Sequence, residues 1–231
     1  MEPSSKVPTL IRDYVARAVP ESAVPGRIRL SQRGVMRLSR TGNWKPFEAT
    51  QTISVREPGF VWEARMRLGW FVTSHITDAF ERGKGRLQAR LFGLLPLARS
   101  AGPETDKGEL MRYLAELVWA PEAMLCNPQL RWREVAAETV EVSAESTGGP
   151  ARVRMIFAEG VVARIEADDR PRTERGRMVP SRWAGRFSEY RRFGAHLLPA
   201  RAEVSWDLDT GCFACWRGEI MKFEPLQENA S

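Results

Sequence analysis

Apolar and polar residues alternate with a period of two along most of this chain. Between residues 60 and 68 every second side chain is apolar, and most of those in between are charged. This alternation is typical of a strand with one buried and one exposed face. It recurs over residues 28–38, 49–55, 140–144, 153–157, 161–165, 202–208 and 213–223. Turn signals such as Glu-Pro-Gly at 57–59 separate these stretches, and connections this short require antiparallel neighbours.

Two segments have helical periodicity instead. In residues 8–19 the apolar positions recur at spacings of three and four, and Pro20 ends the pattern. The second helix is predicted over residues 106–120, where Asp106 followed by Glu109 resembles a capping box. Its apolar face ends just before a proline, which disfavours continuation of the helix.

These elements predict an α+β protein that is mostly antiparallel β: a large curved sheet or half-barrel with two helices packed in the concavity. The chain has no repeat and no long linker, so residues 1–231 are expected to form a single domain. Two connections do not look like turns. Residues 91–97 are apolar and broken by glycine and proline, and we expect them to line a cavity mouth or cover a sheet edge. Residues 168–182 are polar and rich in arginine, which predicts a mobile loop.

The composition is that of a packed globular protein, with 43% apolar and 28% charged residues among 231. The net charge is +6, but the arginines are scattered rather than clustered, so we expect no nucleic-acid partner. The longest stretch without a charged residue, 68–77, is much shorter than the roughly 18 apolar residues of a transmembrane helix. The beginning of the sequence lacks a secretion signal. An odd and small number of cysteines favours a reducing compartment, and a cytoplasmic location is expected.

Motifs for the common catalytic classes are missing from the sequence. The C-x-x-C pair Cys212 and Cys215 falls in a strand-like run, where residues three apart point to opposite faces and cannot chelate one ion. His75 and His196 lie in apolar surroundings typical of core or rim histidines. No nucleophile elbow, phosphate-binding loop or zinc-binding helix motif is present, and a tight hairpin explains the glycines around Lys84. We therefore expect no metal and no cofactor.

The second predicted helix carries a stripe of charged residues. Glu109, Arg112 and Glu116 follow one another at spacings of three and four, with Trp119 beside them. The stripe is either a solvent-facing ladder of ion pairs or a polar patch inside the concavity, and the sequence leaves both open. In the second case Arg112 and Glu116 would orient a polar ligand head or move a proton.

Tryptophan is the other unusual feature, with eight residues spread over the whole chain. Trp62 and Trp206 share a strand face with aliphatic neighbours, which predicts that both point inward, whereas Trp216 is expected on the outer face. Core packing alone could use all eight. Large aromatic side chains are also typical of the walls of an apolar pocket.

Several phrases of the sequence occur together in a characteristic combination: W-K-P-F-E-A-T-Q (44–51), F-V-W-E-A-R (60–65), D-A-F-E-R-G-K-G (78–85), G-E-L-M-R-Y-L-A-E-L-V-W-A-P (108–121) and S-R-W-A-G-R-F-S-E-Y (181–190). The chain resembles a bacterial family of uncharacterised proteins that share the R-Y-L-A-E…W-x-P helix and the W-x-G…Y segment. This resemblance covers nearly the whole chain and implies no established activity. By architecture alone, the predicted fold is similar to LolA-like half-barrels of the lipoprotein-carrier group. Folds of that group bind acyl chains or other apolar ligands, and at least one pigment-biosynthesis enzyme of this shape works without a cofactor.

Our leading hypothesis is that the protein binds a small hydrophobic or amphipathic molecule in the concavity of the sheet. The expected ligand-binding residues, three of them apolar walls, are Trp62, Asp78, Trp119, Arg170 and Trp206. The alternative is a cofactor-independent cyclase, isomerase or lyase of secondary metabolism in the same cavity. It would use Glu116 as acid or base, Arg112 as its electrostatic partner and Tyr190 as a second proton donor or acceptor. The sequence does not indicate the oligomeric state.

Overall fold

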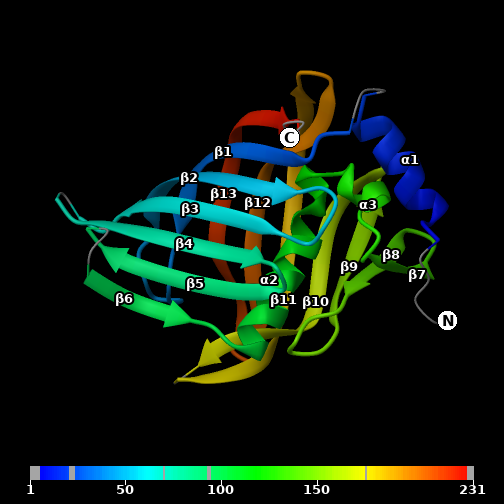
Figure 1. Ribbon diagram of the computed structural model, residues 1–231. Coiled ribbons are helices and arrows are strands. Elements are labelled where there is room, and N and C mark those ends of the chain that lie inside the picture. Colours follow the sequence, from blue (N-terminus) through cyan, green and yellow to red (C-terminus); the bar gives the residue numbers. More distant parts are fainter. Residues whose placement is uncertain (1–5, 21–23, 70, 93–94, 175, 228–231) are drawn as a thin grey trace.

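In a computed structural model, one antiparallel sheet organises the whole chain (Figure 1). The structure describes residues 6–20, 24–69, 71–92, 95–174 and 176–227. Its 13 strands lie in the order β6-β5-β4-β3-β2-β1-β13-β12-β11-β10-β9-β8-β7, so each strand pairs with its chain neighbour except where β1 meets β13. The strands are β1 (Arg27–Met36), β2 (Lys45–Ser54), β3 (Phe60–Arg67), β4 (Thr73–Glu81), β5 (Lys84–Leu91), β6 (Leu95–Ser100), β7 (Arg131–Ala136), β8 (Thr139–Ala144), β9 (Ala151–Ala158), β10 (Val161–Glu174), β11 (Arg177–Phe193), β12 (His196–Leu208) and β13 (Gly211–Leu226).

The sheet is open and curls around helix α2 (Pro103–Glu116), with β1–β6 on one side of the helix and β9–β13 on the other (Figure 1). The short elements η1 (Leu117–Trp119) and α3 (Ala123–Cys126) continue the helical segment. Helix α1 (Thr9–Ala18) packs at one end of the concavity against α3 and β12. Its Tyr14 donates a hydrogen bond to the carbonyl oxygen of Val118 at 3.2 Å. The predicted curved antiparallel sheet with helices packed on its inner side is confirmed.

Helix α2 begins three residues earlier than the sequence predicts. Gly102 is the residue before the first turn, and Asp106 lies inside the helix rather than capping it. The buried Asp106 carboxylate instead accepts a hydrogen bond from the backbone N–H of Gly85 at 2.7 Å and another from the Thr147 hydroxyl. Lys84 also pairs with it at 3.2 Å. The capping-box prediction was wrong because the acid of the pattern fixes the β4–β5 hairpin to the helix.

Glycines allow close approach where the two halves of the sheet meet. Gly34 of β1 lies opposite Gly218 of β13, and a Cβ atom on Gly34 would fall 2.0 Å from the carbonyl oxygen of Arg217. The space above these glycines is filled by Phe47 and Trp216, whose stacked rings lie 5.7 Å apart. A strand glycine of this kind permits the backbone and neighbouring side chains to pack closely.

Residues 168–182 are not a loop. Strands β10 and β11 extend through this stretch as a long hairpin, in which Arg170 pairs with Ser181 and Glu174 with Arg177. The sequence shows no apolar alternation here, because the side of the hairpin that faces the cavity carries Arg170 and Arg172 where an ordinary strand would carry apolar residues. In residues 91–97, β5 runs into β6, while residues 93 and 94 lie outside the described part of the chain.

Candidate functional site

A cavity of about 480 Å³ lies between helix α2 and the inner face of the sheet. Its walls come from both halves of the half-barrel, because α2 lies between them (Figure 1). One wall is formed by β3, β4 and β5, the other by β10 to β13, and α2 supplies the charged side chains between them. The volume is within the range of roughly 300–1,000 Å³ that is typical of small-molecule sites.

The first wall is assembled by strand register. Gln51, Trp62 and Asp78 lie directly opposite one another on β2, β3 and β4, so their side chains share the inner face. Arg112 of α2 reaches this row, where it donates a hydrogen bond to the Asp78 carboxylate. Its guanidinium lies 5.1 Å from the centre of the Trp62 ring and 4.8 Å from that of Phe60. The arginine therefore combines an ion pair with aromatic packing in a largely water-excluded place.

A chain of hydrogen bonds continues from Arg112 into the sheet. The Nε of Arg112 donates to Oε1 of Glu116 at 2.9 Å, and Nε2 of Gln51 donates to Oε2 of the same carboxylate at 2.5 Å. Gln32 in turn donates to Gln51 at 2.9 Å and accepts from the Trp62 indole at 2.8 Å. Because both oxygens of Glu116 are occupied, its carboxylate fixes the position of Arg112. A satisfied buried network of this kind holds its members in one arrangement.

The second wall is aromatic. Trp183, Trp206 and Phe213 lie opposite one another on β11, β12 and β13. Arg170 lies over this row, with its guanidinium 4.5 Å from the centre of the Trp183 ring and 5.6 Å from that of Trp206. Its Nε donates to the carbonyl oxygen of Gly108 at 3.3 Å, which ties the long β10–β11 hairpin to helix α2. On this side the cavity is therefore bounded by Arg170, which stacks on two tryptophan rings, and by helix α2.

Three polar atoms beside this cavity are fully buried: Oδ1 of Asp78, Oε2 of Glu109 and Nε1 of Trp183. Arg170 lies 3.9 Å from Oε2 of Glu109, which is too far for a hydrogen bond. Burial, the neighbouring Asp78 carboxylate and a side-chain hydrogen bond with Asp78 raise the pKa of Glu109 well above its ordinary value, against the opposing effect of Arg170 and Arg112. A protonated Glu109 would donate this hydrogen bond to the Asp78 carboxylate, which Arg112 also contacts.

Seven of the eight predicted site residues line this cavity: Trp62, Asp78, Arg112, Glu116, Trp119, Arg170 and Trp206. The charged stripe of α2 therefore faces the concavity rather than solvent. Tyr190 does not join them: its hydroxyl donates to the carbonyl oxygen of Val162 at 2.8 Å, and the side chain packs against the core. Burial raises the pKa of the Tyr190 phenol above its ordinary value, which makes it a poor acid.

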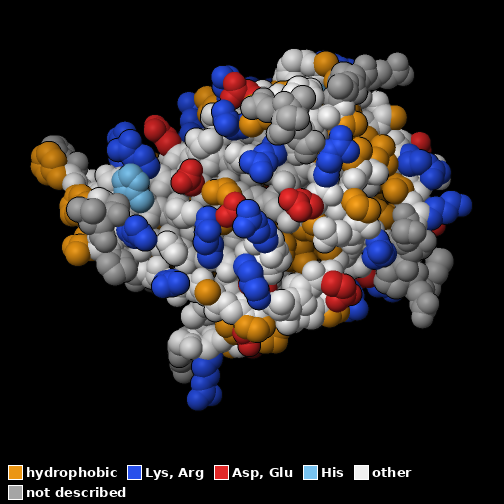
Figure 2. Space-filling view, viewed as in Figure 1, with side chains coloured by type: hydrophobic (Ala, Val, Ile, Leu, Met, Phe, Trp, Pro, Cys, Tyr) orange, Lys and Arg blue, Asp and Glu red, His pale blue; other side chains and the backbone are white. Residues whose placement is uncertain are grey.

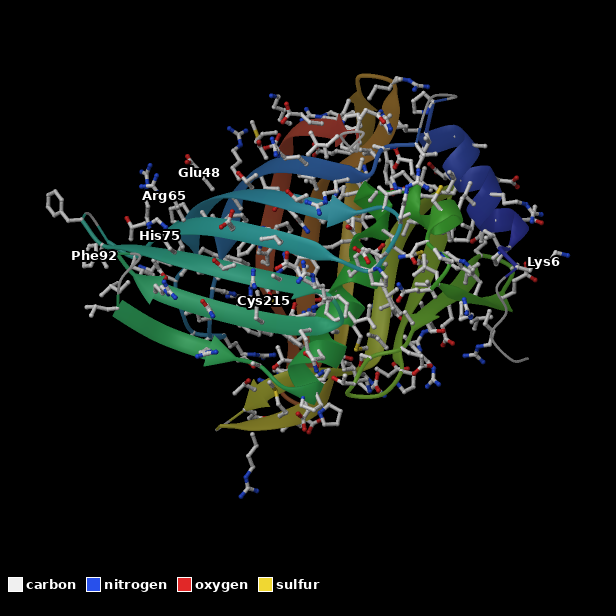
Figure 3. All side chains as sticks on the ribbon, in the orientation of Figure 1. Lys6, Glu48, Arg65, His75, Phe92 and Cys215 are labelled. Carbon is white, nitrogen blue, oxygen red and sulfur yellow. The ribbon has the colours of Figure 1, made fainter. Side chains whose placement is uncertain are left out.

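The prediction for Trp216 was wrong, because this side chain lines the cavity instead of the outer face. A β-bulge is the cause: Val204 pairs with Trp216 but Ser205 pairs with Ala214, so Cys215 is an extra residue that shifts the alternation. Cys215 lines the cavity too, at the interior position labelled in Figure 3. Burial raises the pKa of its thiol to about 11, which keeps it protonated and unreactive at neutral pH.

Sequence reasoning missed several members of the site. Trp183 was noted among the eight tryptophans and in the W-x-G…Y segment but was not assigned to the cavity. Residues 168–182 were interpreted as a loop, and no strand was predicted directly after them. Gln51 had a usable signal, since it replaces an apolar residue on the inner face of an alternating strand. Glu109 was recognised as part of the stripe, but the proton-transfer role was given to Glu116. Nothing in the spacing distinguishes these two carboxyls, because their different partners come from separate strands.

Within the described ranges, no three histidine, cysteine or acidic side chains gather as metal ligands would. All three cysteines are free, and Cys212 is exposed while Cys215 faces the cavity. His196 pairs with Glu122 at 2.7 Å in a buried contact away from the cavity. No helix among the described residues is both long and apolar enough to cross a membrane.

A wider and shallower groove of about 1,200 Å³ lies on the outer face of the sheet. Many of its charges are already paired across neighbouring strands, as in Arg33 with Glu219 at 3.0 Å and Arg217 with Glu203 at 2.6 Å. Both arginines are more than half exposed, so solvent screens these charges. The inner cavity is smaller but is lined by the largely desolvated charges of Arg112, Asp78 and Glu116, and we therefore place the candidate site there.

The comparisons with known proteins support the fold and the family. A structure assigned to an outer membrane lipoprotein-sorting protein domain from Vibrio parahaemolyticus superposes with a TM-score of 0.52 at 9% identity, covering 93% of this chain and 90% of that one. A DUF1329 family protein from Desulfovibrio piger gives a TM-score of 0.48 at 9% identity, with 97% and 94% covered. A search of curated proteins returned no match. The model of a family of unknown function, DUF6544, matches residues 2–218, and this chain belongs to that family.

Proposed function

We propose that this protein binds one small amphipathic molecule in the cavity between helix α2 and the sheet. The observation that carries the proposal is the cavity of about 480 Å³, in which tryptophan walls surround the charged side chains of Asp78, Arg112 and Arg170. Mostly apolar walls with a few converging polar groups are typical of a small-molecule site.

The atoms around the cavity specify the chemistry of the ligand. The carboxylates of Asp78 and Glu116 line the cavity and accept hydrogen bonds, so a ligand head with a hydroxyl or amine donor suits them. Arg112 and Arg170 also line the cavity and donate, so a carboxylate, phosphate or carbonyl acceptor on the head suits them. The remaining walls, including Trp119 and Trp206, suit a hydrocarbon or ring system.

The shared fold is compatible with this proposal but does not carry it. The lipoprotein-sorting domain has the same architecture at 9% identity, which relates the two proteins by fold alone. The cytoplasmic location expected from the sequence remains part of the proposal, supported by three free cysteines. The side chains that line the cavity of this chain, rather than the shared fold, support ligand binding.

Native mass spectrometry of the freshly purified protein, followed by extraction and analysis of released small molecules, tests the proposal. We expect a stoichiometric adduct with an apolar body and a polar head. Trp206→Ala removes part of the cavity wall and should lower the bound fraction at least tenfold. Trp44→Ala is the matched control, because Trp44 packs between Arg37 and Arg217 without lining the cavity. Equal loss in both variants, or no adduct and no binding of any amphipathic probe, would contradict the assignment.

One specific contact favours the enzyme alternative: Glu109 and Asp78 lie side by side on the cavity wall, and burial together with the Asp78 charge raises the pKa of Glu109. Such a pair could donate a proton to a bound ligand and accept one back. The test is to incubate the recovered ligand with the wild-type protein and with Glu109→Gln. Conversion by the wild-type protein alone would support catalysis, whereas unchanged ligand in both samples would leave binding as the function.

A further inference from the structure

Three hairpin connections lie together at one edge of the sheet. The β1–β2, β3–β4 and β5–β6 connections share this edge because the strands are antiparallel neighbours in the order given above. The register places the pairs Met36–Lys45, Arg67–Thr73 and Leu91–Leu95 at the strand ends from which these connections leave. In Figure 1 the end of β3, the start of β4 and the end of β5 lie at the left of the molecule.

This edge carries the most exposed large apolar side chains of the described chain. Phe71 is 87% exposed, Leu38 79%, Leu95 61% and Phe92 53%, and every other exposed large apolar residue in the described ranges is below 50%. In Figure 2 apolar side chains protrude at the left end, and Figure 3 labels Phe92 there. Monomeric proteins usually keep such residues scattered, so their gathering on neighbouring loops indicates an interaction surface.

The described parts of these three connections are basic in sequence. Residues 37–45, 65–69, 71–75, 90–92 and 95–97 contain no acidic residue and six cations: Arg37, Arg40, Lys45, Arg65, Arg67 and Arg90. The first three donate hydrogen bonds to carbonyl oxygens, and Arg40 does so to the β12–β13 turn, which contains Asp209. The last three form no ion pair within the described structure, although Glu48 lies opposite Arg65 in the register. Figure 3 shows Arg65 and His75 beside this apolar end.

The edge also adjoins the opening of the cavity. Leu38 lines the cavity and is at the same time one of the most exposed apolar residues. Met36 and Arg37, which precede it at the end of β1, line the cavity as well. An amphipathic molecule that leaves or enters the cavity near Leu38 would therefore pass the exposed apolar side chains.

We propose that this apolar-basic edge, formed by Leu38, Phe71, Phe92 and Leu95 together with the six cations, docks on the surface of an anionic phospholipid bilayer. Apolar side chains on separate loops with cations around them match a layer of phosphate groups above hydrocarbon. Each cation near an anionic surface contributes roughly a fivefold increase in binding, and each inserted Phe or Leu about tenfold or more. The proposal does not depend on which molecule the cavity holds.

Sedimentation with vesicles tests the docking. Phosphatidylcholine vesicles with and without about a third of phosphatidylglycerol are used at low and high salt. We expect the wild-type protein to sediment with the anionic vesicles and much less with the neutral ones. The double variant Phe71→Ser/Phe92→Ser should lower the partition coefficient at least tenfold. Phe71→Leu/Phe92→Leu should retain most of the binding, because the apolar character is kept.

A matched control is Leu125→Ser/Met221→Ser, which changes two side chains of 47% and 44% exposure away from this edge. It should bind anionic vesicles like the wild-type protein. The proposal is wrong if the wild-type protein does not sediment with anionic vesicles. It is equally wrong if Phe71→Ser/Phe92→Ser and Leu125→Ser/Met221→Ser lose vesicle binding to the same extent. It is also wrong if light scattering shows a wild-type dimer that Phe71→Ser/Phe92→Ser converts to a monomer, since a second copy would then cover the edge.

Discussion

Replacing Arg112 by leucine removes the cation that holds two buried carboxylates together. The side chains of Arg112, Asp78 and Glu116 are 15%, 11% and 12% exposed, so all three charges are largely desolvated. Without the guanidinium, both carboxylates lose the only ion-pair partner that the described structure gives them. Removing one partner of a buried pair typically costs about 3–5 kcal/mol, while a domain is stable by about 5–15 kcal/mol. We expect Arg112→Leu to lower the free energy of unfolding by about 3 kcal/mol or more.

Urea unfolding followed by tryptophan fluorescence measures this effect. Arg33→Leu is the control, because Arg33 pairs with Glu219 on the outer face with 60% of its side chain exposed. A pair of that kind contributes about 0–1 kcal/mol. The triple variant Arg112→Leu/Asp78→Asn/Glu116→Gln removes the charges on both sides and should recover much of the lost stability.

The reasoning would be refuted if Arg112→Leu and Arg33→Leu both cost less than about 1 kcal/mol. That result would mean that water reaches the carboxylates in the cavity and that their charges are not desolvated. A triple variant no more stable than Arg112→Leu would instead assign the loss to packing of the guanidinium on Phe60 and Trp62.

Three further results are expected. Because the pKa of Glu109 is raised on folding, wild-type stability should fall as the pH rises above 4.5 toward that raised value, and Glu109→Gln should lack this slope in urea unfolding between pH 5 and 8. With a pKa of about 11, only about one part in a thousand of Cys215 is thiolate at pH 8. Iodoacetamide should therefore label the exposed Cys212 first, as peptide mass spectrometry can show. Equal labelling of the two cysteines would contradict the burial of Cys215. Gly34→Ala places a Cβ atom 2.0 Å from the carbonyl oxygen of Arg217 and should destabilise the protein by about 1–3 kcal/mol. A melting temperature unchanged in circular dichroism would argue against this close approach.

The sequence alone determined the antiparallel sheet, both long helices and most of the inward-facing residues. Period-two alternation is a local property of a strand with one buried face, so Trp62 and Trp206 could be assigned to the interior from their neighbours. The same logic failed at Trp216, because the bulge at Cys215 depends on how β13 pairs with β12. It also failed for the start of β11, because residues 177–180 are all exposed and show no alternation.

Only the tertiary structure decided what the charged stripe of α2 does. Spacing places Glu109, Arg112 and Glu116 on one helix face, but it does not say what that face meets. In the folded protein Gln51 arrives from β2, Asp78 from β4 and Arg170 from β10, and these partners give the two glutamates different roles. Desolvation and pairing depend on contacts between residues far apart in the chain. A local pattern can therefore show that charged residues share one helix face. Whether each of them is buried and paired depends on how the sheet packs around the helix.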